Sequence, residues 1–144
     1  MKVSEILTRG VAVAHPRQTA SQAAQIMEEN DVGTLPVVKH DGQLVGIITD
    51  RDIALRCDAY GKDPLVVHVE EIMSEHVVWC HPDDDLSTAA KTMADHNIRR
   101  LPVLDRYDQT LQGLLLVDDM VHIDEVAGLV DKILEQQHPH PQSA

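Results

Sequence analysis

The hydrophobic and polar positions of this 144-residue chain follow one pattern, and that pattern occurs twice. A short run rich in β-branched residues, at 11–13 and again at 77–80, precedes a His-Pro pair and predicts a strand. An apolar stripe at helical spacing follows in each copy and predicts a helix. The two stripes are formed by Ala20, Ala23, Ala24 and Met27, and by Leu86, Ala89, Ala90 and Met93.

Both predicted helices begin after a residue that favours a helix start. Thr19 is followed three residues later by Gln22, which is the spacing of a capping box. Asp85 takes the matching position in the second copy, where an acidic residue also suits the helix N-terminus. We therefore expect the helices to begin directly after Thr19 and Asp85.

Two apolar runs follow each of these helices and predict a β-hairpin. In the first copy the runs 35–38 and 44–48 flank an Asp-Gly turn, which supplies the positive φ of a tight hairpin. In the second copy the longer turn 105–109 takes its place. A second helix is expected after each hairpin, over about 50–57 and from about Asp118 onward.

The two copies are related by a nearly constant offset. The tripeptide Leu-Pro-Val at 35–37 returns at 101–103, an offset of 66 (102 − 36), and beyond the hairpin turn Asp52 matches Asp119 at an offset of 67. A repeated supersecondary unit is the natural interpretation. The predicted fold is α/β (α+β), with two β-α-β-β-α repeats.

These observations give a division of the chain into three parts. Repeat 1 is expected over 1–62 and repeat 2 over 63–127. The remaining residues, 128–144, are expected to hold the end of a helix and a disordered tail rich in Pro and His.

Composition and charge narrow the classes of function. The aromatic fraction is 2%, so platforms for stacking single-stranded nucleic acid are scarce. The net charge of -12 argues against a phosphate-backbone partner, and we expect no nucleic acid. No apolar run approaches the roughly 18 residues of a membrane span. We expect a cytoplasmic protein with no membrane partner.

The sequence gives little support for a metal site or for a catalytic nucleophile. The nine His residues are scattered and lack the spacing of a metal site. Cys57 and Cys80 are too few for a disulfide framework or a cysteine zinc site. We therefore expect no catalytic residue and no metal ligand.

The start of the second helix in the first copy carries the most suggestive polar pattern. Gly46 permits close backbone approach, Thr49 stands at the predicted helix N-terminus, and Asp52 follows one turn later on the same side. The pair also fits an ordinary capping box, which stabilises a helix start without any ligand. The two interpretations are compatible in one residue.

The repeated motifs resemble the tandem CBS domain pair, a family named for cystathionine β-synthase. The resemblance covers roughly residues 1–125. It implies two units packed sheet to sheet about a pseudo-twofold axis, with ligand clefts where the copies meet. It also implies further association through helices, for which we expect a homodimer. The resemblance rests on four elements in register, at 33–38, 46–53, 99–103 and 113–120.

In that family the segment Gly-apolar-apolar-Thr/Ser-x-x-Asp helps to hold an adenosine nucleotide. The resemblance assigns the ribose hydroxyls to Asp52 and places the Thr49 hydroxyl near the ribose or the phosphates. It assigns an adenine wall to residues 33–35, whose alternative role is plain turn and core strand. The ligand-binding residues implied are Gly33, Thr34, Leu35, Gly46, Ile47, Thr49, Asp52, Arg99, Arg100 and Asp119.

The second copy departs from this pattern. Leu116 stands where Thr49 stands in the first copy and offers no hydroxyl, whereas Asp119 is retained. We predict one good nucleotide site, centred on Thr49 and Asp52, and a second that is weak, altered or empty.

Two arginines precede the second Leu-Pro-Val run. Arg99 and Arg100 match the place where related proteins direct basic residues toward the phosphates from the neighbouring copy. Adjacent strand residues face opposite ways, so one of the two is expected to reach the cleft. The alternative is a solvated pair of surface charges.

The leading hypothesis is a non-enzymatic regulatory sensor, active in energy sensing, that binds AMP, ADP or ATP. It signals through altered packing of its dimer or of an unknown protein partner. No cofactor is required beyond the nucleotide, which can carry Mg²⁺. The alternatives are a ligand-free interaction or dimerisation module and a binder of another adenosyl ligand, S-adenosylmethionine or NAD.

Overall fold

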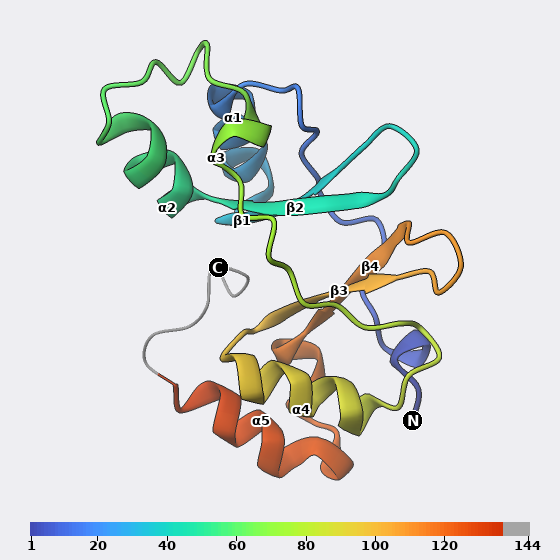
Figure 1. Ribbon diagram of the computed structural model, residues 1–144. Helices are drawn as coiled ribbons and strands as arrows, with labels where there is room; N and C mark the ends of the chain where they lie inside the picture. The colour runs from blue at the N-terminus through green and yellow to red at the C-terminus, as the bar shows by residue number, and fades with distance from the viewer. Residues whose placement is uncertain (137–144) are drawn as a thin grey trace. The chain divides into compact units, whose positions relative to one another are not determined.

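The computed structural model describes residues 1–136, which form two compact units, each built around one β-hairpin (Figure 1). We call residues 12–77 the β1β2 unit, and residues 1–11 together with 78–136 the β3β4 unit. The disorder expected of the tail concerns residues 137–144, which lie outside the described part of the chain.

Both units combine helices with a two-stranded antiparallel sheet, and this confirms the predicted α+β class. The β1β2 unit contains α1 (Ala20–Asn30), β1 (Thr34–Val38), β2 (Leu44–Thr49), α2 (Asp50–Ile53), the π-helical η2 (Ala54–Asp58) and α3 (Val69–Ile72). The β3β4 unit contains the 3-10 turn η1 (Val3–Glu5), α4 (Leu86–His96), β3 (Arg100–Leu104), β4 (Leu111–Leu116), the 3-10 turns η3 (Val117–Met120) and η4 (Asp124–Val126), and α5 (Ala127–Leu134).

The two predicted hairpins are confirmed. β1 pairs antiparallel with β2, and β3 pairs antiparallel with β4. Gly42 adopts a φ of 89° in the Asp-Gly turn, a conformation that glycine adopts without steric cost. The longer second turn uses Gln109 at a φ of 62°.

The strand expected over 11–13 is wrong. Ala14 alone pairs with β1, donating its N–H to the Pro36 carbonyl (2.9 Å) and accepting from the Val38 N–H (2.9 Å). The next bond of this parallel ladder would run from the backbone nitrogen of residue 36 to the carbonyl of residue 12. Because proline has no N–H, the pairing ends at Ala14.

The strand expected over 77–80 is wrong for the same reason. Cys80 donates to the Pro102 carbonyl (3.0 Å) and accepts from Leu104 (2.9 Å) in a single bridge, and Pro102 stops the ladder there. The repeated Leu-Pro-Val tripeptide therefore limits each outer segment to one paired residue.

The first helix of each unit lies where the sequence predicts it. Thr19 Oγ1 accepts from the Gln22 N–H (3.1 Å) and Gln22 Oε1 accepts from the Thr19 N–H (2.9 Å), which confirms the capping box of α1. α4 begins after Asp85, as expected. The Asp85 carboxylate makes no cap, however, and instead accepts from Lys2 Nζ at 2.9 Å.

The second helices of the two units differ. α2 continues into η2, in agreement with the helix expected over about 50–57. The helix expected from about Asp118 onward is wrong at its start, because η3 is a short 3-10 turn and α5 begins only at Ala127. Leu116 stands at the N-cap of η3, where no side chain caps the turn.

The opening segment of each repeat packs on the unit formed by the other repeat. Residues 1–11 belong to the β3β4 unit, where Thr8 and Leu114 exchange two backbone hydrogen bonds of 2.8 and 2.9 Å. Ser74 and Ile47 make the equivalent pair in the β1β2 unit, at 2.8 and 2.9 Å. Both edges of each hairpin are thereby covered, although a two-stranded hairpin alone is only marginally stable.

Each unit has its own aliphatic core, to which the predicted helical stripes contribute. The stripe of α4 is buried completely, but that of α1 is not, because Ala24 is exposed. The matching residue of α4, Ala90, is covered by α5, which packs along α4 (Figure 1).

Candidate functional site

Among the described residues, the buried polar or charged side chains are those of Thr34, Thr49 and Asp52. They gather at one end of the β1β2 hairpin. Thr34 opens β1 directly opposite Thr49, the last residue of β2, and Asp52 lies in α2, which follows at once. The structure therefore brings together three of the predicted ligand residues.

Local hydrogen bonds fix the geometry of Thr49 and Asp52. Asp52 Oδ2 accepts from the Thr49 N–H (2.9 Å), and Thr49 Oγ1 accepts from the Asp52 N–H (3.0 Å), so the two residues form a capping box. Asp52 Oδ1 lies 3.8 Å from Arg56 Nε. A carboxylate has about four acceptor positions, so the cap leaves Asp52 with further capacity to accept from a ligand.

Gly33 and Asp50 border this cluster. The Asp50 N–H donates to the Gly33 carbonyl at 2.9 Å. A Cβ placed on Gly33 would lie 3.0 Å from Asp50 Oδ2, so a larger residue would crowd that carboxylate. The glycine keeps the backbone before β1 open next to the start of α2.

The other predicted residues of the first copy lie in the strands. Leu35 is fully buried in the core of the β1β2 unit and pairs with Ile48 across the hairpin. Gly46 faces residues 73–74, and a Cβ there would lie 2.8 Å from the Ser74 carbonyl oxygen. Ile47 is buried and pairs with Ser74. The close approach that requires Gly46 is therefore to the chain's own backbone.

The equivalent place in the β3β4 unit is built differently. Leu116 provides no cap, and Asp119 is exposed in the turn η3. The Asp119 carboxylate accepts from Thr8 Oγ1 at 2.7 Å. The matching carboxylate thus binds the exchanged N-terminal segment, in place of a capping box.

The two predicted phosphate-binding arginines lie at the start of β3. Arg99 Nη2 donates to the Leu134 carbonyl at the end of α5 (3.5 Å), while its Nε is buried without a partner among the described residues. Arg100 is half-buried, and burial lowers the pKa of its guanidinium, although Asp118 opposes that shift. Within the β3β4 unit, the Arg99 guanidinium therefore forms a hydrogen bond with the C-terminal end of α5.

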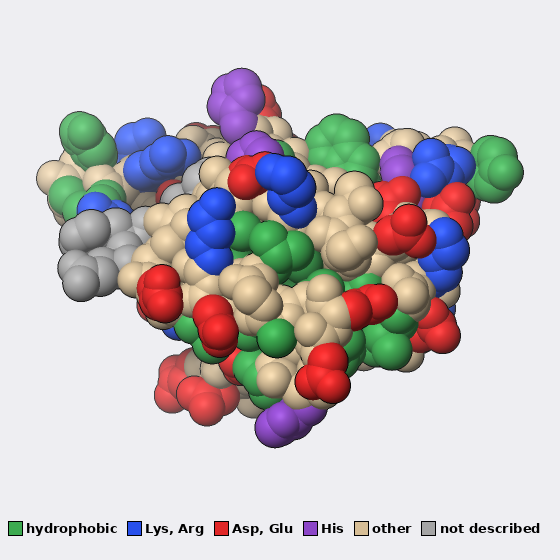
Figure 2. Space-filling model, turned by 90° about the horizontal axis from the view of Figure 1, so that it is seen from below, with side chains coloured by type: hydrophobic (Ala, Val, Ile, Leu, Met, Phe, Trp, Pro, Cys, Tyr) green, Lys and Arg blue, Asp and Glu red, His purple; other side chains and the backbone are tan. Residues whose placement is uncertain are grey.

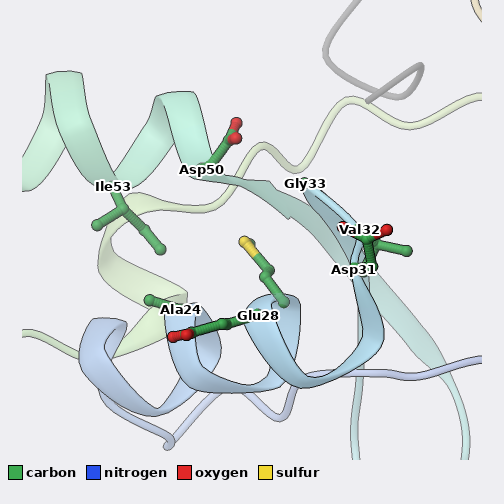
Figure 3. A pocket seen from close by; sticks show the side chains of 8 residues that line it. Ala24, Glu28, Asp31, Val32, Gly33, Asp50 and Ile53 are labelled. Carbon is green, nitrogen blue, oxygen red and sulfur yellow. The ribbon is translucent and has the colours of Figure 1, made fainter.

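A pocket of about 450 Å³, which the sequence did not predict, lies between α1 and α2 in the β1β2 unit. Figure 3 shows Glu28 on α1 and Asp50 and Ile53 on α2 around this hollow, with Gly33 at its edge. Ala24 belongs to the apolar stripe of α1 and is nevertheless exposed, and no sequence signal distinguishes it from its buried counterpart Ala90. The lining residues are Ala24, Met27, Glu28, Asp31, Val32, Gly33, Asp50 and Ile53.

The described residues contain neither a metal-binding cluster nor a membrane-spanning helix. No group of three or more His, Cys, Asp or Glu side chains is placed to hold a metal ion within residues 1–136. No helix in that part of the chain is long and apolar enough to cross a membrane.

Comparison with known proteins places the chain in a family. The sequence model of the CBS domain matches residues 3–57 and 69–125, one match in each repeat. The CBS domain-containing protein YhcV of Bacillus subtilis (strain 168) is 42% identical over 118 residues, which cover 82% of this chain and 81% of the relative. The chain therefore belongs to the CBS domain family, with two CBS repeats.

Solved structures of CBS proteins share the fold. One is CBSX2 in complex with AMP, with a TM-score of 0.72 and 26% identity, covering 86% of this chain and 96% of that one. Another is the CBS domain pair of MJ0100 with 5′-methylthioadenosine and S-adenosyl-L-methionine, with a TM-score of 0.71 and 31% identity, covering 87% and 96%. Both neighbours bind adenosyl ligands.

Proposed function

We propose that this protein is a non-enzymatic regulatory module that binds an adenine nucleotide (AMP, ADP or ATP) at the end of the β1β2 hairpin. Asp52 accepts from the ribose hydroxyls, and the Thr49 hydroxyl contacts the ribose or the phosphates. The backbone of residues 33–35, with Thr34, borders the base. No residue is assigned a bond-making role.

The observation that carries this proposal is the cluster of buried Thr34, Thr49 and Asp52. Burying a carboxylate is costly unless its acceptors are satisfied, and the capping box occupies only part of the capacity of Asp52. Vicinal hydroxyls are suitable donors, as in dinucleotide folds where a carboxylate binds the ribose. The adenosyl ligands of CBSX2 and MJ0100 support the same ligand class.

The proposal includes one good site and not two. In the β3β4 unit Leu116 replaces the hydroxyl residue, and Asp119 is already hydrogen-bonded to Thr8. A ligand there would have to displace that bond and would meet an apolar side chain beside the ribose.

Regulation requires that the nucleotide prefer one of two states of the molecule, because a ligand shifts an equilibrium only by differential affinity. We propose that the states differ in the packing of a homodimer or of a protein partner. Sedimentation of the protein with and without nucleotide tests the dimer directly.

The binding proposal is tested by titration calorimetry with AMP, ADP, ATP, S-adenosylmethionine and NAD. We expect one adenine nucleotide to bind with one site per chain, and Asp52→Ala to weaken it at least tenfold. At about 100 times its dissociation constant the ligand adds roughly 2.7 kcal/mol to stability, which is several degrees in Tm.

Two controls separate ligand binding from helix capping. Asp119→Ala removes the matching carboxylate of the other unit, and Thr19→Val removes the hydroxyl of the similar capping box of α1. Both variants should bind the nucleotide as the parent protein does, although the lost cap costs about 1 kcal/mol of stability. Equal loss of affinity in Asp52→Ala and Asp119→Ala would contradict the assigned site.

The same titrations decide between the alternatives. Binding of S-adenosylmethionine or NAD alone would change the ligand class, and Arg99→Ala and Arg100→Ala would then leave affinity unaltered. No heat with any ligand, from a folded protein, would leave the interaction module as the function.

A further inference from the structure

The exchanged segment of each unit places a hydroxyl beside the second strand of the hairpin. In the β3β4 unit, two backbone hydrogen bonds with Leu114 hold Thr8 on β4. The Thr8 hydroxyl also donates to Asp119 Oδ2 at 2.7 Å, so it ties the N-terminal segment to the turn η3. From this place a hydroxyl therefore reaches the carboxylate that follows the strand.

The β1β2 unit repeats these positions. Ser74 matches Thr8 at an offset of 66 (74 − 8). Asp52 matches Asp119 at an offset of 67 (119 − 52). Ser74 exchanges two backbone hydrogen bonds with Ile47, so the chain after α3 lies beside β2 in the register of its counterpart (Figure 1). Ser74 thus carries a hydroxyl where Thr8 reaches a carboxylate.

The direct bond between hydroxyl and carboxylate is missing in the β1β2 unit. Asp52 Oδ2 accepts from the Thr49 N–H (2.9 Å), and Asp52 Oδ1 lies 3.8 Å from Arg56 Nε. The Ser74 hydroxyl makes no hydrogen bond with any other residue of the described part of the chain, and Ser74 is partly exposed. A hydroxyl and a buried carboxylate therefore stand at matching positions without a bond between them.

We propose that a ribose hydroxyl of the bound nucleotide inserts between Ser74 and Asp52. A hydroxyl can donate and accept at the same time. The Ser74 hydroxyl donates to the ribose oxygen, and the ribose hydroxyl donates to Asp52. The ligand thereby supplies the link that Thr8 makes directly to Asp119 in the other unit. This inference rests on the proposed function, to which it adds a second ribose-binding residue and a requirement for a ribonucleotide.

The capping box explains why the link in the β1β2 unit needs a ligand. Thr49 holds one oxygen of Asp52 at its own N–H. Leu116 forms no cap, which leaves the Asp119 carboxylate to Thr8. A buried carboxylate is stabilised by further donors, and its four or so acceptor positions let a ribose hydroxyl bind while the cap stays intact.

The inserted ribose would also act on the segment that joins the two units. Ser74 lies three residues before the end of the β1β2 unit, and residue 78 already belongs to the β3β4 unit. A ligand bonded to both Ser74 and Asp52 ties residues 73–77 to the start of α2. Binding of the nucleotide should therefore slow the local opening of this segment.

The test combines a change in the ligand with a change in the protein. Titration calorimetry compares AMP with 2′-deoxy-AMP and 3′-deoxy-AMP on the parent protein, Ser74→Ala and Ser74→Thr. In the parent, we expect loss of one of the two ribose hydroxyls to weaken binding at least tenfold. In Ser74→Ala, AMP should bind about fivefold more weakly, which is typical of one hydrogen bond, and the penalty for that deoxy analogue should shrink by about the same factor. Ser74→Thr keeps the hydroxyl and should bind AMP within twofold of the parent.

The deoxy analogues separate recognition of the ribose from general attraction of an anion. Lys and Arg side chains lie beside Asp and Glu on the face of the β3β4 unit that carries α4 and α5, and they attract anions in general (Figure 2). The three nucleotides carry the same phosphate, so this attraction is the same for all of them. Unchanged penalties for both deoxy analogues in Ser74→Ala would overturn the proposal.

Thr8→Ala is the matched control, because it removes the equivalent hydroxyl from the other unit. All three nucleotides should bind this variant within twofold of the parent. Equal loss of AMP affinity in Thr8→Ala and Ser74→Ala would overturn the proposal.

Amide hydrogen exchange gives a second readout. At saturating AMP, exchange of residues 73–77 should slow in the parent and in Thr8→Ala, and should slow less in Ser74→Ala. AMP binding that leaves this exchange unaltered in the parent would overturn the inference and leave the proposed site standing. Absence of binding of AMP, ADP and ATP to the parent would instead overturn the proposed function, and the inference with it.

Discussion

The β1β2 and β3β4 units share a hairpin, a first helix and an exchanged segment, but the chain that follows each hairpin takes a different course. In the β1β2 unit Thr49 closes a capping box with Asp52, and the helix α2 continues into η2. In the β3β4 unit Leu116 leaves η3 uncapped, and the chain turns back to form α5. The replacement of Thr49 by Leu116 at the N-cap thus accompanies the different course of the chain after each hairpin.

The two units also differ in their buried polar side chains and in how far the surface beside the hairpin is covered. The β1β2 unit retains buried polar side chains and an open pocket next to them. The β3β4 unit fills the corresponding surface with α5 and has no buried polar side chain among its described residues. The polar residues of the proposed site therefore lie in the β1β2 unit, whereas apolar packing takes the matching place in the β3β4 unit.

The largest effect on stability is expected from truncating a buried side chain of α5. Ile133 is almost fully buried, so Ile133→Ala should lower the free energy of unfolding by about 2 to 5 kcal/mol through lost burial and a cavity. Ile53→Ala should cost less, because Ile53 lines an open pocket that leaves no enclosed cavity. Urea unfolding of both variants measures the difference. Equal losses in the free energy of unfolding would show that both surfaces are covered to the same degree.

A second effect on stability concerns Gly113 and Gly46, the two glycines against which the exchanged segments pack. A Cβ on Gly113 would clash with the Thr8 carbonyl oxygen and with Leu7, whereas one on Gly46 would meet a movable Met73 side chain and the Ser74 carbonyl oxygen at 2.8 Å. Gly113→Ala should therefore destabilise by about 1 to 3 kcal/mol, and Gly46→Ala by less. Denaturant midpoints decide the order, and the reverse order would contradict these packing contacts.

Most of the regular elements could be predicted from sequence because their signals are local. The Asp-Gly turn at Gly42 and the capping box at Thr19 each act within a few residues, and both were placed correctly. The strands expected over 11–13 and 77–80 were wrong because their pairing depends on Pro36 and Pro102, which lie in another segment of the chain. A missing donor on a distant partner leaves no trace in the local periodicity.

The candidate site was partly visible in the sequence. The spacing of Thr49 and Asp52 indicated both a cap and a ligand contact, and the structure gives the cap its geometry. That Arg99 and Arg100 contact the nucleotide stays a prediction, and so does the weak, altered or empty state of the second site at Asp119. The pocket between α1 and α2 was hidden because Ala24 and Ala90 look alike in sequence, and only the return of α5 makes their environments different.

The smallest effect concerns the thiol of Cys80 in the β3β4 unit, compared with that of Cys57 in the β1β2 unit. Burial raises the pKa of both, and that of Cys80 rises from 9.0 to about 12. At pH 8 the folded protein should hold about a thousandfold less Cys80 thiolate than the unfolded chain, since each pKa unit is a factor of ten. Iodoacetamide should then modify Cys80 mainly after unfolding, as peptide mapping will show.

The same raised pKa sets the sign of a pH effect on stability. As the pH rises above 9, the unfolded chain releases the Cys80 proton while the folded protein retains it, so the free energy of unfolding falls between about pH 9 and 12. Other groups titrate in this range, and the informative quantity is therefore the difference in slope between the parent protein and Cys80→Ala. The variant should lose stability less steeply with pH. An unchanged slope would mean that the thiol ionises alike in both states and that α4 and β3 do not shield it as the structure shows.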